Sequence, residues 1–252
     1  MSGVALACTS AIISGSASKN GRPLLWKHRD TGVEDNFVAK IEAKNAGEFD
    51  YVALYNAEDS IYRDAWLGMN EAGFAIMNTA SYNLAPDITE YKDREGIVMA
   101  LALSKCRTLA DFVNMLDTLP KPLGVQANFG LIDATGDGAY YETDDYRYVK
   151  YSLKDAKDGI LIRTNYSHNR NVDGGYGYIR EENARQLLAP YILADSITAS
   201  TFTEGLSCSF YHSLIGRDFL KGEDRWVVDQ DFIPRRSSTA SVVIEGVQPG
   251  ED

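Results

Sequence analysis

The sequence predicts an α+β fold built largely from antiparallel sheets. Short apolar and β-branched runs, separated by turn signals, gather toward both ends of the chain, and helix-forming segments lie between and after them. That order differs from the regular strand–helix–strand alternation of a parallel sheet. No repeat, Ser/Pro-rich linker or sharp change of composition divides the 252 residues, so one domain is the simplest organisation.

The first strands form a predicted hairpin. Residues 9–14 are a short β-branched and apolar run, Asn20-Gly21 is a strong turn signal, and residues 23–28 return as the second strand. Further strands are predicted over residues 51–56, 65–69, 74–78, 127–132, 139–142, 146–151, 160–163 and 240–244.

Helices are predicted where apolar residues recur at helical spacing. Residues 95–105 form the first, and the second opens on a capping box from Thr108 to Asp111 and ends near Leu119-Pro120. A third helix covers residues 181–194, where Pro190 should kink or end it, and a fourth covers residues 201–206.

Composition excludes several classes of function. With 25 basic and 36 acidic residues, the formal net charge is −11, and no Lys/Arg-rich run offers a nucleic-acid or anionic-lipid surface. No apolar stretch approaches the roughly 18 residues that span a bilayer. Dinucleotide, phosphate-loop, zinc-protease and nucleophile-elbow motifs are missing, and three cysteines with three histidines are too few and too scattered for a structural zinc site. We therefore expect neither a metal nor an organic cofactor.

The segment before Cys8 carries a possible processing signal. Ala5-Leu6-Ala7 matches the A-x-A pattern that signal peptidases cut after, although seven residues are too few for a working signal peptide. Residues 1–7 are therefore either a leader remnant or processed extension, or the beginning of a strand. The first alternative predicts an exported protein, periplasmic or secreted, and the second leaves a cytoplasmic one open. Acylation of Cys8 is less favoured, because Leu6 stands at −2 instead of −3.

Cys8 is the candidate nucleophile. Cys106 and Cys208 lie in apolar surroundings typical of buried thiols, whereas Cys8 precedes polar Thr9 and Ser10. If cleavage freed its α-amine, which titrates near about 8, one residue would supply both nucleophile and base. A structural role for Cys8 is the alternative.

Three polar residues end predicted strands. Asp30 closes the charged run Lys27-His28-Arg29-Asp30, and the hairpin would bring it next to Cys8, although a solvated surface run is the alternative. Asn78 and Asn165 follow two other strands, either as turn residues or as amide donors to an oxyanion.

These segments together resemble N-terminal-nucleophile hydrolases of the cholylglycine hydrolase and penicillin acyltransferase group. Cys8-Thr9 is similar to the Cys-Thr that opens the mature enzymes, and residues 24–30 resemble their second strand with its required Asp. Residues 70–78 resemble the "N-E-x-G-(apolar)-N" segment, and Thr164-Asn165 resembles the "T-N" of the family. The resemblance covers most of the chain in order.

Two positions depart from the family pattern. Lys27 stands where bile-salt hydrolases carry an Arg, so a bidentate guanidinium contact is lost and the match lies nearer the acyltransferase-like branch. The family also has a late arginine near its last core strand. Arg235 and Arg236 both precede the last predicted strand, and Arg236 is our candidate.

The resemblance implies a four-layer αββα sandwich of two stacked antiparallel sheets over residues 8–252. It also implies cleavage of a linear, non-peptide or small peptide-like amide by hydrolysis or acyl transfer, through a thioester on Cys8. Asp30 would orient the α-amine, Asn78 would hold the oxyanion, and Asn165 would position the amine or the substrate, with Lys27 and Arg236 nearby. The expected partner is a small-molecule amide, with no nucleic acid or membrane and a possible homo-oligomer.

Two alternatives stay open from the residues alone. One is a thiol amidase in which Cys8 or Cys208 pairs with His168 or His212 and a carboxylate, because such triads assemble only in space. The other is a non-catalytic binding protein on the same scaffold.

Overall fold

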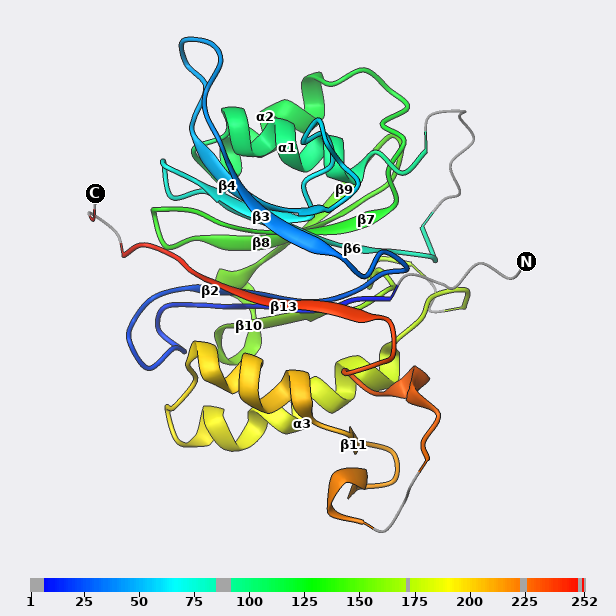
Figure 1. Cartoon of the computed structure of the whole chain (residues 1–252). Helices are drawn as coiled ribbons and strands as arrows, with labels where there is room; N and C mark the ends of the chain where they lie inside the picture. The colour runs from blue at the N-terminus through cyan, green and yellow to red at the C-terminus, as the bar shows by residue number, and fades with distance from the viewer. Residues whose placement is uncertain (1–6, 85–91, 171–172, 223–225, 249–250, 252) are drawn as a thin grey trace.

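Two antiparallel sheets lie face to face at the centre of the protein (Figure 1). The structure is a computed structural model, and it describes residues 7–84, 92–170, 173–222, 226–248 and 251. The smaller sheet has the order β10-β1-β2-β13 and the larger one runs from β3 to β9 in sequence order. The strands of the smaller sheet are β1 (Thr9–Ile13), β2 (Leu24–Asp30), β10 (Ile160–Arg163) and β13 (Ser238–Glu245). Those of the larger are β3 (Asn36–Ile41), β4 (Tyr51–Asn56), β5 (Leu67–Asn70), β6 (Ala75–Ala80), β7 (Ala127–Ile132), β8 (Gly138–Thr143) and β9 (Tyr148–Ser152).

Helices cover the outer face of each sheet, which completes four layers (Figure 1). Helices α1 (Glu95–Lys105) and α2 (Leu109–Thr118) pack on the larger sheet, and α3 (Tyr178–Leu193) packs on the smaller one. A small hairpin of β11 (Tyr211–His212) and β12 (Arg217–Asp218) lies beyond α3. The αββα sandwich of stacked antiparallel sheets is therefore confirmed.

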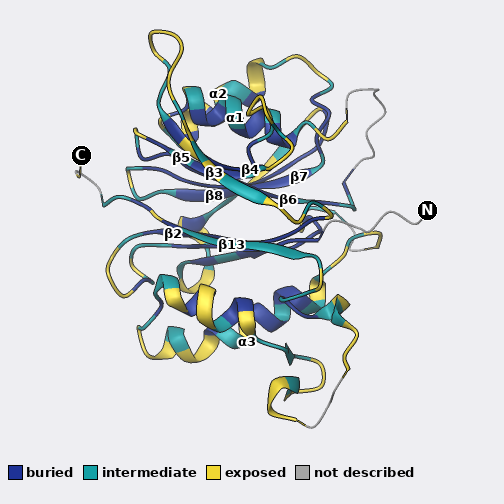
Figure 2. Ribbon diagram, in the orientation of Figure 1, coloured by how far each residue is buried: buried dark blue, intermediate teal, exposed yellow. Residues whose placement is uncertain are grey.

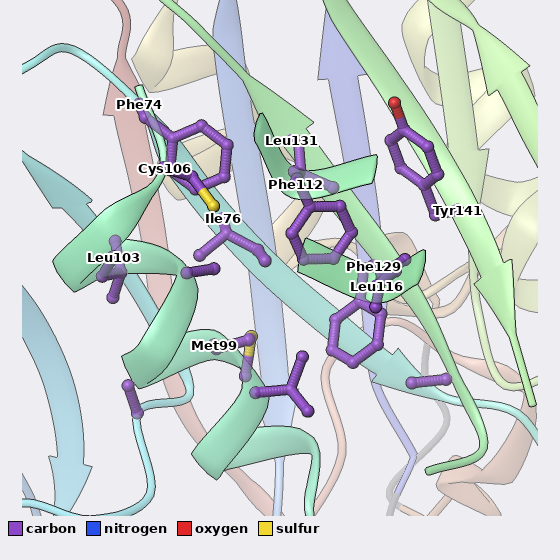
Figure 3. Packing of buried hydrophobic residues seen from close by; sticks show 14 of the residues in the cluster. Phe74, Ile76, Met99, Leu103, Cys106, Phe112, Leu116, Phe129, Leu131 and Tyr141 are labelled. Carbon is purple, nitrogen blue, oxygen red and sulfur yellow. The ribbon is translucent and has the colours of Figure 1, made fainter. Parts of the chain in front are cut away.

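Three apolar clusters hold the layers together. The largest lies between α1, α2 and the larger sheet, where Phe112, Phe129 and Tyr141 meet edge to face (Figure 3). A second cluster fills the space between the sheets, and a third packs Trp26 of β2 against Leu188 of α3. Figure 2 shows the result: the sheets are buried, and each helix turns an exposed face outward.

Strands in the middle of the sandwich are buried on both faces. Every residue of β1 and β2 is buried, including the charged run Lys27-His28-Arg29-Asp30. A solvated surface run is therefore the wrong explanation for these residues. Lys27 and Arg29 point toward the larger sheet, where they bond Asn78 and Asn56, whereas Asp30 points toward the α3 side with His28.

The sequence predictions differ from the structure in a few elements. The sequence does not predict strand β3, because its alternation is short and Val38, on the face opposite the α1–α2 cluster, is 64% exposed. Helix α3 begins at Tyr178 and continues past Pro190 to Leu193, so the proline does not end it. Residues 201–205 form a π-helical turn instead of an α-helix. In the described part of the chain, no helix is both long enough and apolar enough to cross a bilayer.

We expect Phe112→Ala to lower the free energy of unfolding by about 3–5 kcal/mol, because it leaves a cavity among fully buried rings. Urea denaturation followed by circular dichroism measures this loss. Val38→Ala, on an exposed strand face, is the control and should change stability by less than about 0.5 kcal/mol. Equal losses for the two variants would contradict this account of the core.

Candidate active site

Cys8 lies immediately before β1 and is held on three sides. Its backbone N–H donates to Oδ1 of Asn165 at 2.7 Å, and its carbonyl oxygen accepts from Nη1 of Arg180 at 2.7 Å. Its sulfur lies 4.0 Å from the backbone carbonyl oxygen of Asp30. The hairpin thus brings Asp30 to Cys8, as the sequence predicts from the turn at Asn20-Gly21.

Asn165 links Cys8 to both sheets. It follows β10, whose Arg163 pairs with Ser10 of β1, so antiparallel pairing carries Asn165 to the level of Cys8. Its Nδ2 donates to the carbonyl oxygen of Ala80 at 2.9 Å, and its Oδ1 also accepts from Nη2 of Arg180 at 2.8 Å. With donor and acceptor both engaged, the amide has one orientation.

Asn78 and Lys27 meet between the two sheets. Nζ of Lys27 donates to Oδ1 of Asn78 at 2.7 Å and to the carbonyl oxygen of Trp66 at 2.8 Å. Burial lowers the pKa of Lys27 to about 8, and attraction to Cys8 opposes part of that shift. Lys27 and Cys8 therefore share one electrostatic environment on the inner face of the smaller sheet.

The Asp30 carboxylate faces the α3 side. Its Oδ1 accepts from Oγ of Ser238 at 2.6 Å, while its Oδ2 is buried and has no hydrogen-bond donor within reach among the described residues. Nε of Arg235 stands 3.8 Å from Oδ2, too far for a hydrogen bond. Burial is the main reason that the pKa of Asp30 is raised to about 6.

The two late arginines have different surroundings. Arg236 is exposed, and its backbone N–H donates to Asp229, so the structure does not bring its side chain to Cys8. Arg235 instead reaches Asp30, because a turn closed by the hydrogen bond from the Ser238 N–H to the Arg235 carbonyl oxygen precedes β13 and leaves Arg235 beside the end of β2. The structure therefore brings Arg235, and not the predicted Arg236, to Asp30.

Arg180 is a site residue that the sequence did not indicate. It lies in the first turn of α3, is 1% exposed, and contacts Cys8, Thr9 and Asn165. Gly177, with φ +92°, makes this possible, since a Cβ there would collide with the guanidinium. No spacing could have revealed Arg180, because its contacts to Cys8 and Thr9 join residues that are more than 170 positions apart.

A cavity of about 490 Å³ adjoins the cluster on the α3 side. Ala7, Arg235, residues 175–180 and residues 228–231 line it. Ala7 directly precedes Cys8, and this residue forms part of the cavity wall. A second cavity of the same volume lies at the far end of β1, near Ser14 and Gly159, and contains none of the predicted site residues.

The histidines do not pair with a cysteine in the described residues. Nε2 of His168 bonds Glu181 at 2.9 Å, Nε2 of His28 bonds Ser238 at 2.8 Å, and His212 lies 3.8 Å from Asp231. Cys208 is exposed and its sulfur contacts the carbonyl oxygen of Thr203. This geometry gives no support to a Cys–His arrangement.

Comparisons with known proteins agree with the fold. Residues 53–217, more than half of the chain, match the acyl-coenzyme A:6-aminopenicillanic acid acyl-transferase family, and this region includes Asn78 and Asn165 but neither Cys8 nor Asp30. No curated protein matches the chain.

Three solved structures share the architecture. An N-acylethanolamine-hydrolyzing acid amidase ortholog from Caenorhabditis elegans has a TM-score of 0.59 and 18% identity, over 79% of this chain and 86% of that one. Penicillin G acylase from Alcaligenes faecalis has a TM-score of 0.56 and 13% identity, over 81% of this chain and 53% of that one. A variant of conjugated bile acid hydrolase from Clostridium perfringens has a TM-score of 0.51 and 12% identity, over 84% and 83%. At these identities the likeness concerns the fold.

The raised pKa of Asp30 predicts a pH-dependent stability difference. Between about pH 4 and pH 6 the folded protein holds a proton on Asp30 that the unfolded chain releases, so this group lowers the free energy of unfolding as pH rises. The Asp30→Asn substitution removes this titrating group, and the amide oxygen of the new side chain can still accept the hydrogen bond from Ser238. Urea unfolding of both proteins should show the variant gaining stability relative to wild type up to about pH 6, and a constant difference above it. Parallel curves over the whole range would contradict the burial of this carboxylate.

Proposed function

This chain belongs to the acyl-coenzyme A:6-aminopenicillanic acid acyl-transferase family, and we propose that it is an N-terminal-nucleophile enzyme that uses Cys8. It would cleave a linear, non-peptide or small peptide-like amide, with water or a second amine as the acyl acceptor. Family membership supports chemistry at an amide C–N bond. The choice of Cys8 as nucleophile and of a thioester as intermediate is our proposal.

The observation that carries the proposal is the unsatisfied Asp30 carboxylate beside the start of β1. Thr9 pairs with His28, and this register, continued by two residues, would bring Ala7 across from Asp30. As an amide, the Cys8 nitrogen has one hydrogen, which Asn165 already accepts. If the chain were cut before Cys8, an α-amine would replace this amide and Ala7 would vacate the space beside Oδ2 of Asp30. The added N–H groups would then satisfy that buried oxygen.

The reaction follows from these positions. The α-amine takes the proton from Sγ of Cys8 as the sulfur attacks the substrate carbonyl carbon. Nδ2 of Asn78, together with a backbone N–H, stabilises the oxyanion. The C–N bond breaks, the leaving amine receives the proton, and the acyl group stays on Sγ as a thioester. Water or a second amine then attacks the thioester, and the thiol of Cys8 is restored.

Three further expectations accompany this proposal. Export of the protein rests on Ala5-Leu6-Ala7, and Ala5 and Leu6 lie outside the described residues. Assembly into a homo-oligomer and a small-molecule amide as sole partner likewise stay predictions. No cofactor takes part in the proposed steps.

We expect the protein beginning at Cys8 to be active and the protein that retains residues 1–7 to be inactive. An amide nitrogen has no basic lone pair to take the thiol proton, and Ala7 occupies the cavity wall. Intact mass identifies each form, and a panel of N-acyl amino acids and penicillins reports turnover. Cys8→Ser in the shortened form should retain weak activity at most. Equal turnover by a form that keeps residues 1–7 would overturn the mechanism and favour a Cys–His enzyme.

Asn78→Ala should reduce kcat by about 10²–10³-fold, the usual cost of one oxyanion donor. The variant should stay folded but melt at a lower temperature, because the buried ammonium of Lys27 loses one of its two hydrogen-bond partners, so kcat is measured well below the melting temperature. Steady-state kinetics on any amide that the shortened protein turns over gives the comparison. Retention of wild-type kcat would remove Asn78 from the mechanism.

A further inference from the structure

Lys27 is a buried cation with neutral hydrogen-bond partners. It is 2% exposed, and its ammonium donates to the side chain of Asn78 and the backbone of Trp66. Among the described residues no carboxylate accepts a hydrogen bond or forms an ion pair with it, and Cys8 and Glu95 act on its charge without direct contact. Burying a charge without a counter-ion destabilises a protein, and an apolar side chain of similar length would avoid that cost. A lysine at this position therefore needs a reason other than packing.

The hydrogen bond to Asn78 determines which way that amide points. An ammonium group only donates, so it must face Oδ1 and not Nδ2. Its second bond, to the carbonyl oxygen of Trp66, anchors Nζ on the larger sheet. Nδ2 then points away from Lys27, and no acceptor for it is present among the described residues. The pair leaves Asn78 with one free donor in a defined direction.

We propose that Lys27 is a positioning residue that holds Asn78 with Nδ2 free to donate to the oxyanion. The inference rests on the proposed function and assigns a purpose to the lysine that replaces the arginine found in bile-salt hydrolases. Lys27 acts through Asn78 and does not itself need to touch the substrate.

Arg29 provides a natural comparison. It lies two residues further along β2, on the same inner face, and is also buried and electrostatically coupled to Cys8. Its guanidinium, however, bonds Asn36 of β3 and Asn56 of β4, at the edge of the larger sheet, and not Asn78 of β6. Removing Arg29 therefore removes a similar charge and leaves the orientation of Asn78 alone.

The protonation state of Lys27 adds a second readout. The groups that act on it are Cys8 from β1, Arg29 from β2 and Glu95 from α1, and its pKa is about 8. A neutral amine can accept a hydrogen bond as well as donate one. Above this pH the amide of Asn78 is therefore free to rotate and to exchange the positions of Oδ1 and Nδ2. The α-amine of Cys8 must be neutral to act as base, which gives the rising limb of the pH profile. Deprotonation of Lys27 should then make kcat fall on the alkaline side of this profile.

A double-mutant cycle tests the proposal. Lys27→Met, Asn78→Ala and the double variant are made in the protein that begins at Cys8, and kcat is measured with a chromogenic acyl p-nitroanilide. Lys27→Met should lower kcat by about 10–100-fold, as removal of a group that orients a catalytic residue typically does. In the Asn78→Ala background the same change should alter kcat by less than about twofold, since nothing remains to orient.

The control is the Arg29→Met substitution, made in the wild-type and in the Asn78→Ala background. Its effect on kcat should be the same in both. Lys27→Arg should keep part of the activity, because a guanidinium also donates to Oδ1, and should move the alkaline limb to higher pH. Circular dichroism confirms that each variant is folded.

The other possible outcomes of these experiments each contradict a different part of the proposal. Equal losses from Lys27→Met in the two backgrounds, or no loss in either, would overturn the positioning role while the proposed function stands. A wild-type kcat in Asn78→Ala would instead overturn the oxyanion role of Asn78. Absence of turnover by the shortened wild-type protein on every amide tested would overturn the proposed function together with this inference.

Discussion

The antiparallel pairing of β1 with β2 is the interaction on which the candidate site depends. Its register, with Thr9 opposite His28, places the residue before β1 beside the end of β2. The hairpin alone therefore brings Cys8 next to Asp30, with Lys27 and Asp30 on opposite faces of β2. The other elements complete what this hairpin begins. Strand β10 adds Asn165, β6 adds Asn78, and the first turn of α3 adds Arg180.

The position of this hairpin in the sandwich accounts for the unusual electrostatics of the site. Both faces of β2 are covered, so a run of four ionisable residues is buried in a chain whose net charge is −11. Alternation along the strand sends Lys27 and Arg29 to the larger sheet and Asp30 to the α3 side. Cys8 thus lies between a cationic inner face and a carboxylate on the outer one. In the proposed mechanism Cys8 would form an anionic intermediate and carry an α-ammonium, and these two charges would each face a group of opposite sign.

Family and geometry support different parts of the proposed function. The family match covers residues 53–217, which contain Asn78 and Asn165. Cys8, Lys27 and Asp30 lie upstream of the matched region, and their connection to it comes from contacts in the structure. The hydrogen bonds from Cys8 to Asn165 and from Lys27 to Asn78 join the two parts into one cluster.

The sequence by itself determined the fold class, the hairpin and the residues at its ends. Those features depend on local patterns: β-branched runs, the Asn20-Gly21 turn, and the Thr108 capping box that the structure also contains. Strand β3 escaped prediction because Val38, an apolar residue on its exposed face, breaks the apolar–polar alternation of a half-buried strand. Local patterns also could not tell Arg235 from Arg236, since the direction of a side chain depends on how the chain enters β13.

Only the tertiary structure decided the burial of Lys27 and Asp30 and the contact of Arg180 with Cys8. These facts arise when segments distant in sequence pack together, and a buried charge looks the same as an exposed one in a sequence. Burial sets the pKa of Asp30 and of Lys27, because it removes the water that would stabilise their charged forms.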